Sequence, residues 1–323
     1  MPHVVQITEH GSPEVMRLVE VPRPVPGRGE ARIRQTAVGV NYIDIYHRTG
    51  VYPVTLPVVL GSEGAGVVEA IGPEVTEVKV GDRVAYQGLL GGYAEERLAP
   101  AARLVPIPAG IDDKTAAAAL LKGVTAYYLL FRTFKVGRGH TILFHAAAGG
   151  TGSLACPWAA ALGATVIGTV GSDGKMAIAR ANGCTHVINY RREDFAARTR
   201  ELTNGAGVDV VYDSVGKDTF PGSLDALKPL GMWVSFGQSS GVPPPFTAGD
   251  LQRRGSLFAT RPTTVHYFAK RNDLLDAAKA TFEAIAKGTI KVAIGAEFPL
   301  HDAAAAHRAL ESRQTVGSSI LVP

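Results

Sequence analysis

The stretch TILFHAAAGGTG, residues 141–152, decides the fold, because a short apolar strand runs directly into a small, glycine-rich turn that begins a helix. In the register of the dinucleotide fingerprint, the three glycine positions are occupied by Ala147, Gly149 and Gly152. Gly149 would allow close backbone approach and Gly152 close packing of helix on strand, while the N–H groups of the helix would face a pyrophosphate. Alanine replaces the first glycine, so the turn predicts a dinucleotide site only together with its surroundings.

Further apolar segments follow the turn at regular intervals, with amphipathic helical segments between the earlier ones. They are Thr165–Val170, His186–Asn189, Val208–Asp213, Met232–Phe236 and Leu257–Thr260. With the strand before the turn, they predict an α/β fold built on a Rossmann-type, doubly wound parallel sheet. The ligand is expected at the carboxyl ends of the strands, where the strand order reverses.

The residues before the turn have another pattern, with short β segments separated by Pro and Gly, as in a small barrel or sandwich. These segments are Ala31–Val38, Gly66–Ile71 and Arg83–Tyr86. The rest of the chain predicts a helix at Asp113–Arg132, one long helix after Arg261 to Lys287, a strand, a helix from Asp302 and a last strand at Ser318–Val322. We therefore predict a β-rich domain of residues 1–124 and 266–323, a dinucleotide-binding domain of residues 125–265, and a small-molecule site in the cleft between them.

Composition agrees with this division without deciding it. The chain has 323 residues, 46% of them hydrophobic, and a net charge of +4. Lys and Arg are scattered, so the basic excess does not indicate nucleic-acid binding. The start, MPHVVQITEHG, lacks the apolar core of a secretory signal, and Lys122 and Gly123 interrupt the apolar segment Thr115–Phe131. We expect a cytoplasmic protein without a membrane span.

The two cysteines, Cys156 and Cys184, belong to no CxxC or Cys/His cluster. A disulfide framework and structural zinc are therefore not expected. Cys156 falls in the helix after the glycine turn, where we predict an inert, packed thiol rather than a nucleophile.

Several motifs in the right order resemble one group of proteins. The chain resembles the medium-chain dehydrogenase/reductase superfamily in GSEGAG at Gly61–Gly66, VGDRV at Val80–Val84 and the AAAGGTG turn. More narrowly, it resembles the NADPH-dependent quinone oxidoreductases of the zeta-crystallin branch in GVNYIDIYHRTGVYP, LLKGVTAYYLL, YDSVG, SFGQSSG, TRP and GSSILVP. The resemblance covers essentially the whole chain. It implies a Rossmann domain beside a GroES-like catalytic domain, and a homodimer that pairs the sheet edges near Leu257–Thr260.

The zinc-dependent members of this superfamily carry a cysteine where this chain has Asn41 and a histidine where it has Ser62. An amide and a hydroxyl cannot replace a thiolate and an imidazole at a catalytic zinc. The cysteines of the structural zinc lobe are also missing between Tyr86 and Arg103. Without metal as Lewis acid, the acceptor must already be electrophilic, such as a quinone or an activated alkene. No single acid or base is then expected to be indispensable, because the cofactor supplies the difficult chemistry.

By resemblance, the nicotinamide and the acceptor are lined by Asn41, Tyr46 and Tyr52. Either tyrosine would stack on a flat ring or donate its hydroxyl, although half-buried packing with a satisfied hydroxyl is the alternative. The family's cofactor contacts correspond to Tyr42, Ile43 and Asp44, expected in the same loop, and to Thr125 and Tyr128 in the domain-joining helix. For Ile43 and Tyr128, ordinary core packing is the alternative.

The end of the second strand of the sheet indicates which cofactor binds. An NAD enzyme places Asp or Glu there, about 20 residues past the glycine turn. Here the strand ends in VGS, residues 170–172, without an acid. By resemblance, the extra phosphate of NADPH would contact Lys175, Tyr190 and Arg313, since cations and hydroxyls suit a phosphate. Asp173 argues against NADPH, unless solvent on the turn screens its charge.

The remaining cofactor contacts implied by the resemblance follow strand ends, as the fold rule requires. They are Gly149, Gly150, Thr151 and Gly152 at the pyrophosphate, then Gly171, Ser172, Ser214, Val215, Phe236, Gly237, Gln238, Ser239, Arg261 and Pro262. Gly, Ser and Pro are also ordinary turn residues, which is the alternative for this set. His145, just before the turn, is predicted to be a packed strand-end residue rather than a base.

Three functions remain open at this point. The first is NADPH-dependent reduction of a quinone. The second is reduction of an alkenal, an enone or an enoyl thioester with the same cofactor geometry, because the sequence does not reveal the acceptor. The third is an NADPH-binding protein with a structural or RNA-binding role, which only the basic excess supports. Short-chain dehydrogenases are disfavoured, because their dinucleotide turn begins the chain.

Overall fold

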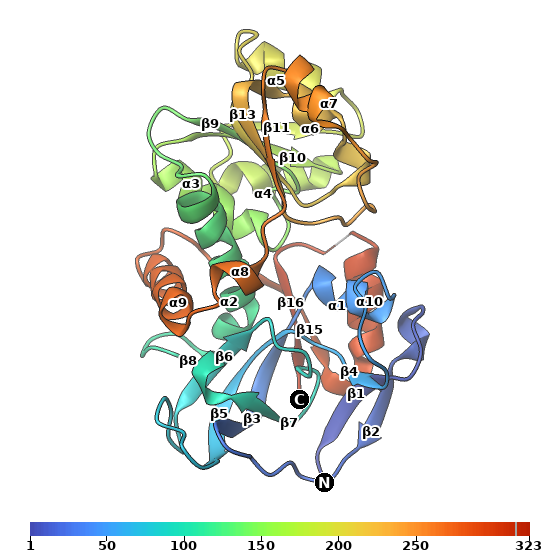
Figure 1. Ribbon diagram of the computed structural model, residues 1–323, viewed down its shortest axis with the longest axis vertical. Helices are drawn as coiled ribbons and strands as arrows, with labels where there is room; N and C mark the ends of the chain where they lie inside the picture. Colours follow the sequence, from blue (N-terminus) through green and yellow to red (C-terminus); the bar gives the residue numbers. More distant parts are fainter. Residues whose placement is uncertain (314) are drawn as a thin grey trace. The chain divides into compact units, whose positions relative to one another are not determined.

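A six-stranded parallel sheet is built around the glycine turn (Figure 1). The computed structural model describes residues 1–313 and 315–323 and divides the chain into two units. The dinucleotide unit, which carries this sheet, comprises Gly123–Ala269 and Lys287–Lys291. The β-rich unit comprises Met1–Lys122, Lys270–Ala286 and Val292–Pro323.

The strand order of the parallel sheet is β11-β10-β9-β12-β13-β14. The strands are β9 (Thr141–Phe144), β10 (Thr165–Val170), β11 (His186–Asn189), β12 (Val208–Asp213), β13 (Leu227–Ser235) and β14 (Phe258–Thr260). The order runs outward from β9 in both directions, so the prediction of a doubly wound Rossmann sheet is confirmed. The carboxyl ends of β9 and β12 flank the point of reversal.

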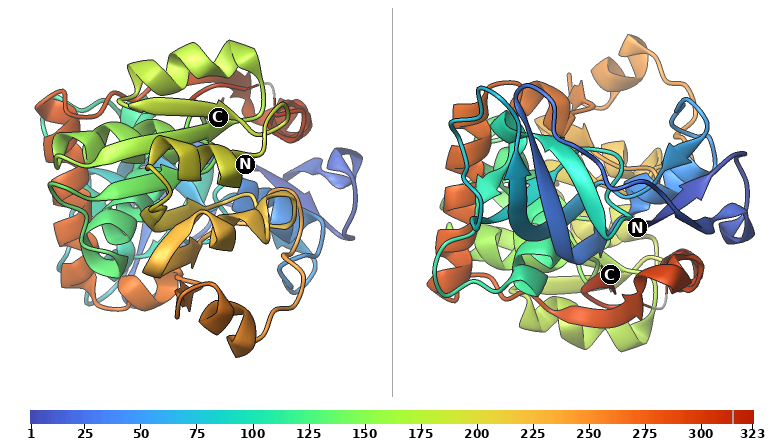
Figure 2. Two further views of the ribbon diagram at one scale, coloured as in Figure 1. Left: turned by 90° about the horizontal axis from the view of Figure 1, so that it is seen from above. Right: turned by 90° about the horizontal axis from the view of Figure 1, so that it is seen from below.

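These strands form because their apolar residues are covered by helices on both faces of the sheet, which Figure 2 shows in its left view. Ile142, Val166 and Val210 are fully buried, and each such burial contributes about 1.5–3 kcal/mol. The helices of this unit are α3 (Gly152–Ala161), α4 (Met176–Ala181), α5 (Phe195–Leu202), α6 (Gly222–Asp225), α7 (Ala248–Arg253) and α8 (Thr264–Tyr267).

Two predicted elements are wrong in extent, and the helical segment predicted at Asp113–Arg132 is confirmed with a change of helix type near its end. The long helix expected up to Lys287 is interrupted between α8 and α9 (Arg271–Ala286), because Phe268 leaves helical geometry and buries its ring against Tyr128. The helix expected at Asp113–Arg132 is α2 (Asp113–Tyr127), which passes into a π-helical turn, η3 (Tyr128–Thr133). Strand β13 begins at Leu227 and not at the predicted Met232. Its first residues were missed because the left-handed Leu230 and a register irregularity between Val208 and Val210 of β12 interrupt the regular strand pattern.

The β-rich unit has a seven-stranded sheet of order β15-β16-β3-β5-β6-β8, with β7 paired to β3, and a three-stranded sheet of order β2-β1-β4. The strands are β1 (His3–Ile7), β2 (Arg17–Glu20), β3 (Glu30–Val40), β4 (Val58–Val59), β5 (Glu63–Ile71), β6 (Arg83–Gln87), β7 (Glu96–Pro100), β8 (Val105–Pro106), β15 (Ile294–Pro299) and β16 (Ser318–Val322). The last strand of the chain, β16, pairs antiparallel with β3, so the C-terminal residues complete this sheet (Figure 2, right view).

The segment after β3 is a helix, α1 (Tyr42–Arg48), where the sequence predicted a loop. The Asp44 carboxylate accepts a hydrogen bond from the Asn41 backbone N–H at 2.9 Å, which ties the first helical turn to the residue before it. In the C-terminal part, α10 (Ala303–Glu311) begins one residue after the predicted Asp302. Among the described helices, none is both long and apolar enough to span a membrane.

Candidate active site

The glycine turn has the close packing that its sequence predicts. A Cβ on Gly152 would clash with the carbonyl oxygen of Ala146 and lie 2.7 Å from the Ala147 Cα. Ala146 itself adopts a left-handed backbone with φ of 54°, a conformation that costs a non-glycine residue energy and is common at functional turns. Thr151 precedes the first residue of α3, so Gly149–Gly152 lie at the N-terminal end of this helix, where phosphates bind.

His145, at the end of β9, is fully buried. Its Nδ1 lies 2.8 Å from the Thr169 hydroxyl and its Nε2 lies 3.1 Å from the Ser223 hydroxyl. Burial lowers the pKa of this imidazole. It is therefore a neutral packed residue with both ring nitrogens engaged.

The turn after β10 brings together residues of the predicted phosphate site. A Cβ on Gly171 would lie 2.9 Å from the Tyr190 hydroxyl, so this hydroxyl lies against the Gly171 backbone. Burial, and then the charge of Arg191, lowers the pKa of Lys175, which places two cations near each other. Sequence reasoning missed Arg191, although the RR pair that follows Tyr190 after β11 was its signal.

Asp173, which argued against NADPH, is neutralised locally. Its carboxylate forms an ion pair with Arg192 at 2.7 Å and accepts a hydrogen bond from the Asn189 amide at 2.7 Å. The negative charge at this turn is thus balanced by a neighbouring cation rather than only by solvent.

The loops after β12 and β13 hold other predicted contacts at the same edge of the sheet. Asp213, the last residue of β12, accepts hydrogen bonds from the N–H groups of Val215 and Gly216 at 2.9 and 3.0 Å, and so shapes the turn at Ser214 and Val215. Arg261 donates to the Gly237 carbonyl at 2.8 Å and to the Gln238 side chain at 3.1 Å. Its guanidinium therefore braces the turn that contains Phe236, Gly237, Gln238 and Ser239, and Pro262 follows it.

The two predicted contacts near the start of the dinucleotide unit are both buried. Thr125 lies in α2, and the Tyr128 ring stacks on the Tyr267 ring with centroids 4.6 Å apart. Tyr128 is thus part of an aromatic cluster, which is the core-packing alternative described above. Arg313 belongs to the β-rich unit, where it follows α10 with a left-handed φ of 58°.

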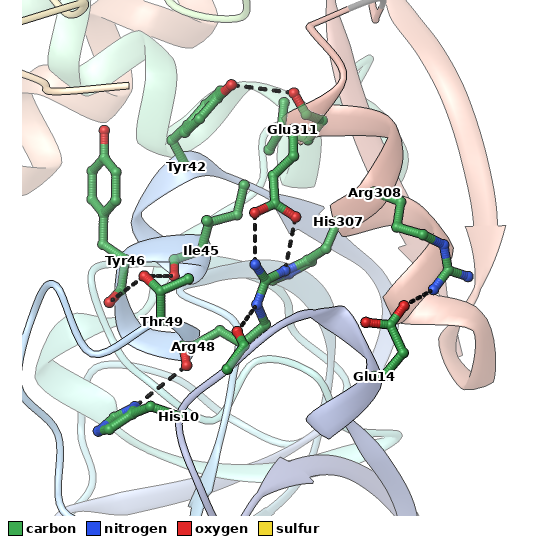
Figure 3. A network of polar contacts seen from close by, with 12 residues as sticks. His10, Glu14, Tyr42, Ile45, Tyr46, Arg48, Thr49, His307, Arg308 and Glu311 are labelled. Atoms are coloured by element: carbon green, nitrogen blue, oxygen red, sulfur yellow. Dashed lines mark hydrogen bonds and ion pairs between the residues drawn. The ribbon is translucent and has the colours of Figure 1, made fainter. Parts of the chain in front are cut away.

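Helix α1 brings the predicted pocket tyrosines together. The ring centroids of Tyr42 and Tyr46 lie 6.2 Å apart, and those of Tyr46 and Tyr52 lie 5.1 Å apart. The Tyr42 hydroxyl donates to the Leu310 carbonyl at the end of α10 at 3.2 Å (Figure 3). Ile43 is half-buried on the same helix.

Two polar residues of the β-rich unit escaped sequence reasoning. The His47 ring lies 6.1 Å from the Tyr52 ring, burial lowers its pKa, and its Nδ1 is buried without a hydrogen-bond partner. Gln87, opposite Glu63 in the β5–β6 ladder, has both amide atoms buried without a partner. His47 lies in the motif GVNYIDIYHRTGVYP, whereas Gln87 belongs to none of the quoted motifs, so only the fold reveals its position.

Asp44 is buried inside the β-rich unit. Besides the Asn41 N–H, its carboxylate accepts hydrogen bonds from the Ser62 hydroxyl at 2.7 Å and the Tyr93 hydroxyl at 3.2 Å. Burial raises the pKa of Asp44 to about 6. The side chain of Asp44, a residue predicted to contact the cofactor, is therefore engaged by donors of the protein itself.

The residues at the two zinc-ligand positions are likewise engaged by carboxylates. Ser62 donates to Asp44, and the Asn41 side-chain Nδ2 donates to Glu63 at 3.0 Å. Within residues 1–313 and 315–323, no group of three or more His, Cys, Asp or Glu side chains is arranged to hold a metal ion. The donors present, an amide and a hydroxyl, do not fit a catalytic zinc.

Comparison with known proteins gives consistent matches along the chain. A family model described as zinc-binding dehydrogenase matches residues 150–277, and one described as alcohol dehydrogenase GroES-like domain matches residues 27–109. A quinone oxidoreductase of Pseudomonas aeruginosa is 48% identical over 99% of both chains, and a 2-haloacrylate reductase of a Burkholderia species is 47% identical over 98% of both. The crystal structure of Escherichia coli quinone oxidoreductase complexed with NADPH superposes with a TM-score of 0.97 at 45% identity, over 99% of this chain and 100% of that one.

Proposed function

The chain belongs to the quinone oxidoreductase family within the zinc-binding dehydrogenases, and we propose that it is a zinc-independent reductase that transfers a hydride from NADPH to a quinone. The observation that carries this proposal is the use of the two zinc-ligand positions. The Asn41 side-chain amide donates a hydrogen bond to the Glu63 carboxylate, and the Ser62 hydroxyl donates one to the Asp44 carboxylate. Because an amide and a hydroxyl take the places of the zinc ligands, the site suits an acceptor that is already electrophilic.

Bound NADPH supplies the hydride, and one proton completes the hydroquinone, so NADPH, a proton and a quinone give NADP⁺ and hydroquinone. The chain has to hold the reactants and stabilise the oxygen that gains negative charge. We assign the second task to the hydroxyls of Tyr46, which lies on α1, and Tyr52, which follows this helix; their ring centroids are 5.1 Å apart. A hydrogen-bond donor aimed at a developing oxyanion is the arrangement that such a reaction requires.

The turn after β10 supports NADPH rather than NADH. Lys175 lies near Arg191, the Tyr190 hydroxyl adjoins Gly171, and the charge of Asp173 is balanced by Arg192. Two cations and a hydroxyl suit the 2′-phosphate, which carries negative charge and strong acceptor oxygens. We propose that the predicted contacts at Gly149–Gly152 bind the pyrophosphate of the same cofactor.

Reduction of an activated alkene is a second candidate. It is favoured by the 47% identity to a 2-haloacrylate reductase over 98% of both chains. Hydride addition to a conjugated carbon uses the same cofactor and the same hydroxyl donors, so only the shape of the acceptor pocket separates the two activities.

We also propose a homodimer and a cytoplasmic location. The strand β14 lies at the edge of the parallel sheet, and Phe258 in it is 56% exposed. An exposed apolar edge strand is a surface that proteins cover by pairing. Cys156 and Cys184 are both buried free thiols, which suits a reducing compartment.

The test is the oxidation of NADPH, with NADH in parallel, by protein treated with EDTA. Three acceptors are compared: 1,4-benzoquinone, an α,β-unsaturated ketone and 2-chloroacrylate. Rapid quinone-dependent turnover that prefers NADPH and is unaffected by EDTA supports the proposal. Faster turnover with 2-chloroacrylate or the ketone moves the function to the second candidate, and loss of turnover after EDTA would contradict the zinc-independent reaction.

A further inference from the structure

A buried ion pair lies directly behind Asn41. Glu63, the first residue of β5, has a fully buried side chain whose carboxylate accepts hydrogen bonds from three donors. These are the Asn41 Nδ2 at 3.0 Å, the Lys122 Nζ at 3.0 Å and the backbone N–H of Leu121 at 2.6 Å. Lys122 is itself 7% exposed, so both charges have been removed from water, which is tolerated only when they are paired and hydrogen-bonded.

The neighbouring strand leaves room for this carboxylate. Gly39 of β3 pairs with Glu63 of β5, and a Cβ on Gly39 would clash with the Glu63 Oε2 and with the Ala117 carbonyl oxygen. Its distance to the Glu63 Cδ would be 2.9 Å. Only glycine at this position lets the carboxylate pass over the β3 backbone toward Asn41.

The pairing fixes the orientation of the Asn41 amide. An ionised carboxylate only accepts hydrogen bonds, so the side-chain group that faces Glu63 must be the Nδ2 and not the Oδ1. The Asn41 backbone is held as well, because its N–H donates to the Asp44 carboxylate at 2.9 Å. The side-chain carbonyl oxygen therefore faces away from Glu63 and toward the backbone N–H of Asp44, with which the Asn41 side chain takes part in a capping box; its second lone pair remains for another donor.

We propose that Glu63, charge-balanced by Lys122, is a positioning residue that turns the Asn41 carbonyl oxygen into a fixed hydrogen-bond acceptor for the bound reactants. This inference rests on the proposed function. An amide held in this way recognises an N–H or O–H group, either the carboxamide of the nicotinamide or the hydroxyl of the hydroquinone. The N–H that Asn41 gives to Glu63 is not available to an oxyanion, and we leave that task with the tyrosine hydroxyls.

The test is a cycle of the variants Glu63→Gln, Asn41→Ala and the double variant. A neutral amide at position 63 can donate as well as accept, so it no longer imposes one orientation on Asn41. We expect Glu63→Gln to lower kcat/KM for benzoquinone about tenfold, the equivalent of one hydrogen bond. In the Asn41→Ala background, the same substitution should change kcat/KM less than twofold. Equal losses in both backgrounds, or no loss in either, would overturn the proposal.

Two further measurements keep the test decisive. Glu63→Gln alone leaves the buried ammonium of Lys122 unpaired, and this variant could fail to fold. In that case the variant Glu63→Gln with Lys122→Met, which removes both charges, takes its place in the cycle. NADPH binding, measured by fluorescence titration without acceptor, shows which group donates to the Asn41 carbonyl oxygen. Coupling between positions 63 and 41 in the Kd of NADPH indicates the carboxamide of the nicotinamide. Coupling in kcat alone indicates the hydroxyl of the hydroquinone. The binding measurement also separates failure of this inference from failure of the proposed function. Coupling in the Kd of NADPH without any quinone turnover would support the positioning role of Glu63 and would refute quinone reduction as the function.

Discussion

Replacing Arg48 by methionine should destabilise the β-rich unit by about 3–5 kcal/mol. Arg48 is 1% exposed and ties α1 to α10 (Figure 3). Its guanidinium donates to both carboxylate oxygens of Glu311 at 3.0 and 2.6 Å, to the His307 Nδ1 at 3.0 Å and to the Gly11 carbonyl at 3.0 Å. Methionine keeps the apolar stem of the side chain but has no hydrogen to donate.

The magnitude follows from what each partner loses. Glu311 is 34% exposed and can be hydrated again, so this ion pair counts for about 1 kcal/mol. His307 is fully buried, and burial, together with the charge of Arg48, lowers its pKa to about 3. Since the neutral ring already donates from Nε2 to the Tyr93 hydroxyl, its Nδ1 would become a buried acceptor without a donor, at about 1–3 kcal/mol. The Gly11 carbonyl adds about 0.5–1.5 kcal/mol.

The assay is urea unfolding followed by circular dichroism, with tryptophan fluorescence in parallel. Trp158 and Trp233 both lie in the dinucleotide unit, so fluorescence reports that unit while circular dichroism reports both. The control is Arg28→Met, which removes a 2.7 Å ion pair to Glu74 between side chains 77% and 59% exposed; this change should cost less than about 1 kcal/mol. An equally small cost for Arg48→Met would refute the reasoning.

Three other predictions follow from the same structure. Gly152→Ala should weaken NADPH binding at least tenfold in a fluorescence titration, because its Cβ would lie 2.7 Å from the Ala147 Cα, whereas Gly174→Ala, with open space around its Cβ, should not. Burial raises the pKa of Asp44 from 3.8 to about 6. Between these values the folded state keeps a proton that the unfolded state releases, so the free energy of unfolding should fall by up to about 3 kcal/mol as the pH rises from 4 to 6. Unfolding curves of Asp44→Asn should lack this fall. Lys175→Ala with Arg191→Ala should raise the Kd of NADPH about 10–100-fold and leave that of NADH unchanged.

The dinucleotide sheet could be read from the sequence because of how it is buried. The predicted strands Thr165–Val170, His186–Asn189 and Val208–Asp213 coincide with β10, β11 and β12. Parallel strands covered on both faces are continuous apolar runs, which are visible in a single sequence. The break at Phe268 was hidden for the same reason, since a buried aromatic residue continues an apolar helical pattern whether or not the backbone is helical.

The site was less accessible to sequence reasoning, because its polar contacts join residues far apart in the chain. In the sequence, Lys122 is only a charge that interrupts an apolar segment. In the structure, its ammonium balances the carboxylate of Glu63, which lies in β5. The RR pair at Arg191 is visible in the sequence, but Arg191 gains a role only because β11 lies beside β10, where its charge acts on Lys175. Patterns along the chain reveal which face of an element is buried, but they do not reveal which two polar side chains meet there.

The contacts behind Asn41 and Ser62 also explain why restoring two zinc ligands would not restore a zinc enzyme. Cysteine at position 41 would bind zinc as a thiolate and would deprive Glu63 of the amide donor that it now has, whereas histidine at position 62 could still donate a ring N–H to Asp44. Lys122 would still hold its ammonium 3.0 Å from Glu63, close to the place where a cation would have to bind. Metal independence is therefore supported by the carboxylates and the lysine behind the two positions as well as by the substituted ligands, and a change of chemistry would require all of them to change together.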